Sequence, residues 1–186
     1  MPRGPDNDPV FEKVGSGVLP DVAAWGVEGG DYSDDGRYRW SFRRRWGPGG
    51  SVCWVGLNPG TGDSDGKRRP TLRKMVAWTE RWGGGEIIIV NLFAFRTTNP
   101  KELYAAARAG IDVIGHRNDD AIRTAEGGAM RTVAAWGADG RLLDRGAAVD
   151  GLLSRPVCLG VTRRGEPRHP LYVALATEPI AYRRTL

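Results

Sequence analysis

The loop after the apolar run at residues 53–57 carries more polar and flexible residues than a turn requires. A connector that only reverses the chain needs a single Gly or Asn. Within nine residues this loop contains amide, carboxylate and glycine groups, namely Asn58, Gly60, Gly62, Asp63, Asp65 and Gly66. We interpret it as part of a ligand site, in which Asp63 or Asp65 could accept a proton and Asn58 could only hold a water.

His169 is a second candidate, in the loop that follows the apolar run at residues 157–161. It stands between Arg168 and Pro170, a context that argues against a place in the core. Histidine changes its charge near neutral pH and serves both as a proton donor and as a hydrogen-bond donor. We therefore favour a functional role for His169 over a chance surface position.

Several familiar motifs are absent. The spacing from Gly60 to Gly66 and Lys67 is one residue too long for a phosphate-binding P-loop, and Arg68 replaces its Ser or Thr. The dinucleotide-binding pattern fails because Asp65 occupies the place of its third glycine. Two histidines and two scattered cysteines provide no zinc ligand cluster. We expect neither a cofactor nor a metal.

The chain is basic, with 27 Lys and Arg against 22 Asp and Glu and a net charge of +5. Such a balance favours an anionic partner, a nucleic acid or a nucleotide, although a merely solvated basic surface is the alternative. The basic residues that fall in the candidate loops, and would contact phosphates there, are Lys67, Arg68, Arg69, Arg163, Arg164 and Arg168.

Composition also bounds the class of protein. With 186 residues, of which 40% are apolar, the chain can bury one core without disulfides, and we expect Cys53 and Cys158 to be reduced and buried. Neither a membrane-spanning run nor an apolar signal core is present. We expect a cytoplasmic protein without a membrane partner and, by default, a monomer.

Alternating strand and helix patterns predict the fold. Residues 1–35, rich in Gly, Pro and Asp, are expected to form a loosely ordered arm, and residues 36–186 a single α/β domain. The predicted strands lie at 38–46, 51–57, 86–95, 132–137 and 155–162, the first two forming a hairpin; the predicted helices lie at 71–82, 99–110, 116–127 and 145–154. This order predicts an open, largely parallel sheet with helices on both faces, in three layers.

The same pattern predicts where a ligand binds. In open α/β sheets, ligands bind outside the carboxyl ends of the strands. The predicted strands from the second onward each end in a polar loop, at residues 58–66, 96–100, 138–141 and 162–172. We expect these four loops to share one edge of the sheet.

The motifs also carry a resemblance. From Tyr38 to Tyr172 the chain resembles a bacterial family of unknown function, the one numbered sixteen forty-three, through "WVGLNPGTGDSDG", "VNLFAFRTTNP" and "PRHPLY". More remotely, the order of the motifs resembles the uracil-DNA glycosylase superfamily. "GLNPG" is similar to the first loop of its mismatch-specific branch, and "RHP" is similar to its His-Pro motif.

The remote resemblance implies roles for individual residues. Asn58 would orient an attacking water, Asn91 would read the edge of a pyrimidine, and His169 would stabilise negative charge on the departing base. Substrate contacts would come from neighbours of these residues in the same motifs, namely Gly56, Pro59, Gly60, Phe93, Pro170 and Tyr172. The cysteines that hold an iron–sulfur cluster in some branches are absent, so no such cluster is implied.

These roles describe an N-glycosidase, a hydrolase that releases a modified or deaminated base from DNA or from a related nucleotide. Such a reaction requires a placed water, a donor to the anionic base and a pocket for that base. The alternative is a protein that binds a nucleotide or a nucleic acid in the same pocket without chemistry.

Overall fold

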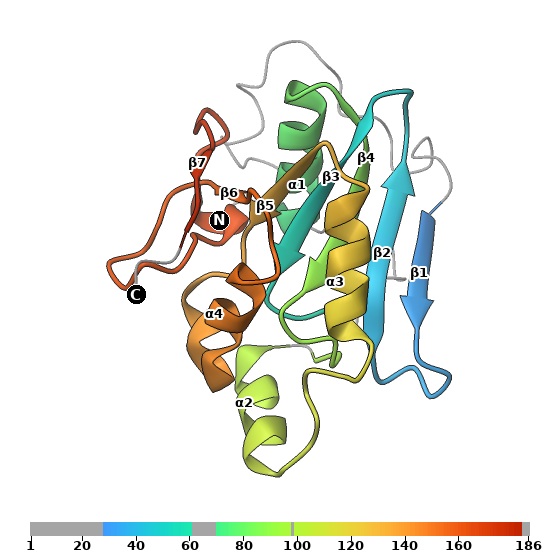
Figure 1. Ribbon diagram of the computed structural model, residues 1–186, viewed down its shortest axis with the longest axis vertical. Helices are drawn as coiled ribbons and strands as arrows, with labels where there is room; N and C mark the ends of the chain where they lie inside the picture. Colours follow the sequence, from blue (N-terminus) through green and yellow to red (C-terminus); the bar gives the residue numbers. More distant parts are fainter. Residues whose placement is uncertain (1–27, 61–69, 98, 184–186) are drawn as a thin grey trace, which may run out of the picture.

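Seven strands form one mixed sheet in the order β1-β2-β4-β3-β5-β6-β7 (Figure 1). The computed structural model describes residues 28–60, 70–97 and 99–183. The strands are β1 (Glu28–Tyr32), β2 (Arg39–Arg45), β3 (Gly50–Gly56), β4 (Gly84–Asn91), β5 (Arg131–Ala134), β6 (Val157–Cys158) and β7 (Ile180–Ala181). The centre of the sheet, β4-β3-β5-β6, is parallel, whereas β1, β2 and β7 join it antiparallel.

Helices cover both faces of this sheet, so the predicted three-layer α/β architecture is confirmed. Helix α1 (Pro70–Arg81) lies on one face; α2 (Pro100–Arg108), α3 (Asn118–Gly127) and α4 (Arg145–Asp150) lie on the other. Two short 3-10 helices, η2 (Ala138–Asp144) and η3 (Pro170–Tyr172), follow β5 and β6 in the chain.

Strand β3 shows how the sequence produces two cores. Its side chains alternate between the faces, as period-two geometry requires. Val52 and Trp54 pack in the cluster that includes α1, whereas Cys53 and Val55 pack in the cluster that includes α2, α3 and α4. A strand buried on both faces reads as a continuous apolar run, and this accounts for the patterns of β3 and β4.

One sequence prediction about the first strands is wrong. The strands at 38–46 and 51–57 do not pair as a hairpin, because β4 lies between β2 and β3 and pairs with both. Of the arm predicted for residues 1–35, residues 28–32 form β1, which pairs antiparallel with β2, and residues 1–27 lie outside the described residues. Gly29 and Gly30, which have low strand propensity, conceal β1 in the sequence.

Both cysteines are reduced and buried, as the sequence predicts. Burial raises the pKa of Cys53 to about 12, so its thiol stays protonated and serves as a small apolar group. Within the described part of the chain, no helix is both long and apolar enough to cross a membrane.

Candidate functional site

A pocket of about 950 Å³ lies at the carboxyl ends of the parallel strands. It is lined by the loops that follow β3, β4, β5 and β6, and by α1. Asn58, Asn91 and His169 all border it, so residues separated by 33 and 78 positions meet where the strand order predicts. We refer to this cavity, with Asn58, Asn91, Asp139 and His169 on its wall, as the strand-end pocket.

Asn91 ends β4 and is only 3% exposed. Its Nδ2 is buried and has no hydrogen-bond partner within the described structure. Its parallel neighbour on β3 is Gly56, where an added Cβ would lie 2.8 Å from Asn91 Oδ1. The glycine therefore leaves the space that the amide occupies, and Nδ2 is a buried donor whose hydrogen bond is unused in the described structure.

A buried polar network behind Asn91 fixes the end of β4. Asn118 Nδ2 donates to the carbonyl oxygens of Asn91 at 3.0 Å and of Leu92 at 2.8 Å. Arg145 Nε also donates to the Leu92 carbonyl at 2.8 Å, and its guanidinium pairs with Asp119. The backbone that carries Asn91 is therefore held from α3 and α4. Sequence reasoning missed this support, because the contacts join residues far apart in the chain.

Asn58 is held by the loop that follows β4. Its Nδ2 donates to Thr97 Oγ1 at 2.8 Å, and Thr97 N donates to the Pro59 carbonyl at 3.1 Å. These bonds join the loops after β3 and β4. Because the amide nitrogen is turned toward Thr97, the amide oxygen is the end of Asn58 that can accept a hydrogen bond from a water or a ligand.

His169 enters the strand-end pocket from the start of η3. Its Nδ1 accepts a hydrogen bond from Leu171 N at 3.3 Å, so the proton of a neutral ring resides on Nε2. Burial lowers the pKa of His169 below its usual value, which favours this neutral form. His169 therefore presents an N–H donor at neutral pH.

Two features of the fold position His169. Gly137, directly before η2, has φ 77° and ψ −169°, a conformation that favours glycine, and a Cβ there would lie 3.2 Å from the His169 Cβ. Lys74 of α1 is 7% exposed and donates from Nζ to the carbonyls of Leu171 at 2.8 Å and Val173 at 3.0 Å. The lysine anchors η3, so it is a structural group and not part of a solvated basic face.

The remaining predicted substrate contacts divide into two groups. Gly56, Gly60 and Tyr172 line the strand-end pocket, and Tyr172 is 80% exposed with its ring centroid 5.8 Å from that of His169. The other three, Phe93, Pro59 and Pro170, are buried residues that are not on the described wall of the pocket. Phe93 packs in the core with Leu92, because the apolar run of β4 continues past the strand end.

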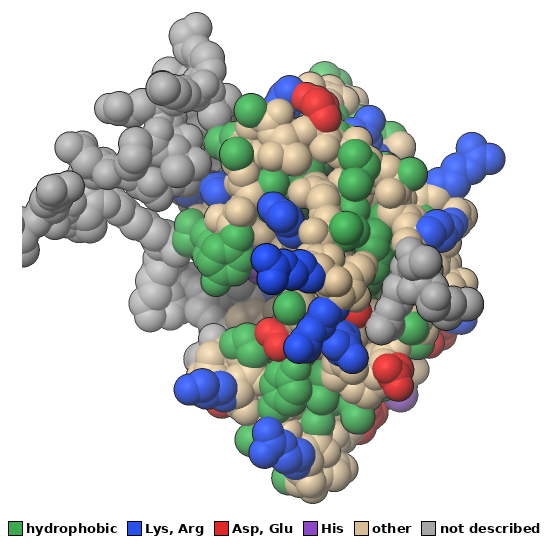
Figure 2. Space-filling model, turned by 90° about the vertical axis from the view of Figure 1, so that its left-hand side faces the viewer, with side chains coloured by type: hydrophobic (Ala, Val, Ile, Leu, Met, Phe, Trp, Pro, Cys, Tyr) green, Lys and Arg blue, Asp and Glu red, His purple; other side chains and the backbone are tan. Residues whose placement is uncertain are grey.

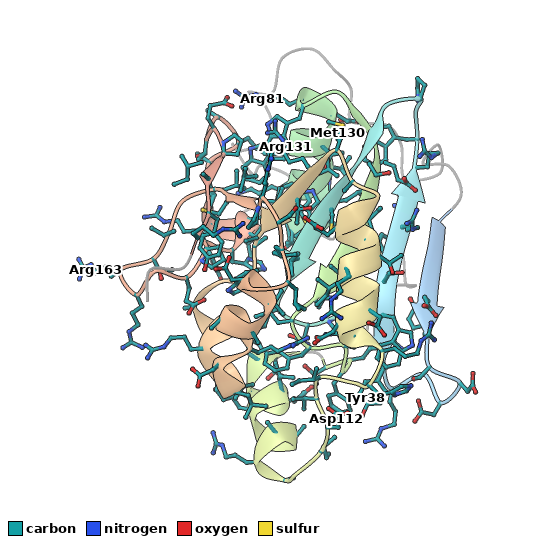
Figure 3. The ribbon with its side chains drawn as sticks, in the orientation of Figure 1. Tyr38, Arg81, Asp112, Met130, Arg131 and Arg163 are labelled. Carbon is teal, nitrogen blue, oxygen red and sulfur yellow. The ribbon has the colours of Figure 1, made fainter. Side chains whose placement is uncertain are left out.

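The predicted phosphate contacts are dispersed. Arg168 borders the strand-end pocket, whereas Arg163 and Arg164 are the exposed central residues of a turn closed by the bond from Gly165 N to Thr162 O. Figure 3 shows Arg163 pointing away from the molecule, and Figure 2 shows Lys and Arg side chains separated by other surface on the β7 side. Some predicted residues lie outside the described residues: Asp63, Asp65, Lys67, Arg68 and Arg69.

Asp139 is a pocket residue for which the sequence indicates a candidate loop but no role. It stands in the first turn of η2, and its Oδ1 accepts a hydrogen bond from Tyr104 Oη at 3.0 Å. Burial, followed by this bond to Asp139, raises the pKa of Tyr104, so the phenol remains a donor. No role for Asp139 follows from the sequence, because its partner Tyr104 is 35 residues away in the chain.

The fold is an α/β sheet with a pocket at the carboxyl ends of its parallel strands. The chain belongs to the family described as "Protein of unknown function (DUF1643)", whose profile matches residues 39–171. This span includes Asn58, Asn91, Asp139 and His169 of the strand-end pocket. Neither the curated proteins nor the solved structures contain a match to the chain.

Proposed function

We propose that this protein is an N-glycosidase of the uracil-DNA glycosylase type. It would hydrolyse the bond between a modified or deaminated base and its sugar, in DNA or in a related nucleotide. The observation that carries this proposal is the pair of donors in the strand-end pocket, the unpaired Asn91 Nδ2 and the Nε2–H of neutral His169.

The chemistry of the reaction matches these groups. Breaking an N-glycosidic bond leaves the electron pair on the base, so negative charge develops on its carbonyl oxygens and ring nitrogens. Donors held in a water-poor pocket stabilise that charge most strongly in the transition state. Asn91 is fixed to recognise a carbonyl at the base edge, and His169 to donate to the departing anion.

Asn58 supports the other half of the reaction. Its amide nitrogen is committed to Thr97, so its oxygen can accept a hydrogen bond from the attacking water. An amide has no basicity to remove the water's proton, and a second group must do so.

A second candidate is a protein that binds a nucleotide or a nucleic acid end without chemistry. The volume of about 950 Å³ supports it, because pockets of this size accommodate a ligand as large as a whole nucleotide. The two candidates use the same pocket and differ in whether a bond is broken.

A substrate panel tests the proposal. The purified protein is incubated with single-stranded and duplex oligonucleotides that carry uracil, hypoxanthine or xanthine, and in parallel with the corresponding free nucleotides. Free base in the supernatant, lost in an Asn91→Ala variant, is the expected result. Tight binding of any of these compounds with no base released would favour the second candidate.

A further inference from the structure

Hydrolysis in the strand-end pocket needs a group that removes a proton from the attacking water. The two residues that can hold the substrate as donors, Asn91 and His169, do not meet this need, and neither does the amide of Asn58. Among the described residues that line the pocket, the one carboxylate is Asp139.

Tyr104 prepares one side of this carboxylate. The phenol of Tyr104, on α2, donates to Asp139 Oδ1, and this bond leaves Oδ2 as the second acceptor of the carboxylate. A carboxylate with one oxygen held by a fixed donor has few orientations. Such restriction is what a group acting on a single water requires.

The backbone around Asp139 is also restricted. Gly137 precedes it in a glycine conformation, and Gly140 follows it in close contact with Trp136, where an added Cβ would lie 2.2 Å from Cδ1. Trp136 is in turn held by a hydrogen bond of 2.9 Å from its Nε1 to the buried Glu166. The turn that carries Asp139 is therefore packed on both sides.

One stretch of chain supports both Asp139 and Asn58. Thr97 binds the Asn58 amide, and α2, which begins three residues later, supplies Tyr104 for Asp139. The bonds to both side chains therefore come from nearby parts of the chain, and both residues line the strand-end pocket.

We propose that Asp139 is the general base of the strand-end pocket, accepting the proton of a water that Asn58 holds, with Tyr104 as its positioning residue. This inference rests on the proposed glycosidase function. In the step, the water oxygen bonds to the anomeric carbon while the bond from that carbon to the base nitrogen breaks. The electron pair leaves with the base, and the water proton passes to Asp139 Oδ2.

The test measures single-turnover base release from the oligonucleotide that the wild-type protein cleaves best among those carrying uracil, hypoxanthine or xanthine. We expect Asp139→Asn to lower the rate by about 10²–10⁴, the usual contribution of a general base, with substrate affinity and melting temperature close to wild type. Tyr104→Phe retains the carboxylate and should cost less. Asp144→Asn, an exposed carboxylate in the same 3-10 helix, is the matched control and should retain the wild-type rate.

Chemical rescue distinguishes the loss of the general base from a disturbed fold. Asp139→Ala leaves space for a small carboxylate, so added formate should raise its rate, whereas Asp144→Ala should not respond. If Asp139→Asn releases base within threefold of wild type, or formate leaves Asp139→Ala unchanged, this inference is overturned and the glycosidase proposal stands. A wild-type protein that releases no base overturns both.

Discussion

The unpaired amide of Asn91 leads to a prediction that separates function from stability. Asn91 and Asn118 are both buried asparagines, 3% and 0% exposed, and each has one side-chain atom without a hydrogen-bond partner within the described structure. They differ because Asn118 Nδ2 donates two hydrogen bonds to backbone carbonyls and Asn91 Nδ2 donates none. The pair is therefore a matched comparison.

The expected difference follows from the bonds. Replacing either residue by Ala removes one unsatisfied polar atom, a relief of similar size in both variants. Asn118→Ala additionally loses two hydrogen bonds worth about 1 kcal/mol each, so it should be less stable than Asn91→Ala by about 2 kcal/mol. For a chain of this size that corresponds to a melting temperature roughly 4–8 °C lower. The side chain of Asn91 borders the pocket, so its removal enlarges an existing space.

Thermal melting and single-turnover base release, measured on the same two variants, check this reasoning. Asn91→Ala should melt near or above the wild-type temperature and lose base release by at least about 10²-fold, the cost of one donor to developing negative charge. Equal destabilisation by Asn91→Ala and Asn118→Ala would show that Asn91 Nδ2 is satisfied in the free protein. That result would refute the argument that it is held in reserve for a ligand.

The remaining predictions concern His169, Gly56 and the exposed arginines. His169→Ala should lower the rate of base release by about 10²–10³-fold with little effect on substrate binding. Because burial lowers the pKa of His169, the unfolded chain binds the proton more readily than the folded protein, so wild-type stability should fall as the pH drops below about 6.5. Denaturation at several pH values should show this dependence in the wild type and a weaker one in His169→Ala. Gly56→Ala places a Cβ 2.8 Å from the amide oxygen of Asn91 and should reduce the rate of base release while changing the melting temperature little. An unchanged rate would contradict the close contact between Gly56 and the Asn91 amide. If Arg163 and Arg164 bind phosphates, replacing both by Ala should make the log–log salt slope of duplex binding shallower by about 0.9 for each phosphate that is no longer neutralised, and an unchanged slope would show that neither arginine binds DNA.

Much of the site was predictable because parallel strands end at one edge. Asn58 and His169 lie in loops that follow predicted strands, and Asn91 lies in the second half of a third. Alternating helices make these strands parallel, so their meeting required no knowledge of long-range contacts. The loop that carries Asp139 was expected at the same edge, but the bond between Asp139 and Tyr104 was not predictable. Their bond joins two segments that carry no shared pattern.

The errors have a similar origin. The turn sequence after β2 favours a hairpin, but pairing is decided by which strands bury each other, and β4 is apolar enough to occupy the place between β2 and β3. Phe93 carries the same apolar character as its neighbours and gives no local sign of whether it faces the pocket or the core. A period-two pattern identifies the two faces only for residues within the strand, and Phe93 lies beyond the end of β4.

Hydrolysis in water enriched in ¹⁸O would establish whether the protein breaks an N-glycosidic bond by attack of water on the sugar. The wild-type protein is incubated with the panel of modified oligonucleotides and nucleotides, and the masses of the products are measured by mass spectrometry. We predict a free base without label and a sugar that has gained one ¹⁸O at its anomeric carbon, because the water attacks the sugar and the bond electrons leave with the base. Substrate that binds the strand-end pocket and is recovered intact, or label found in the base, would contradict the proposed glycosidase reaction.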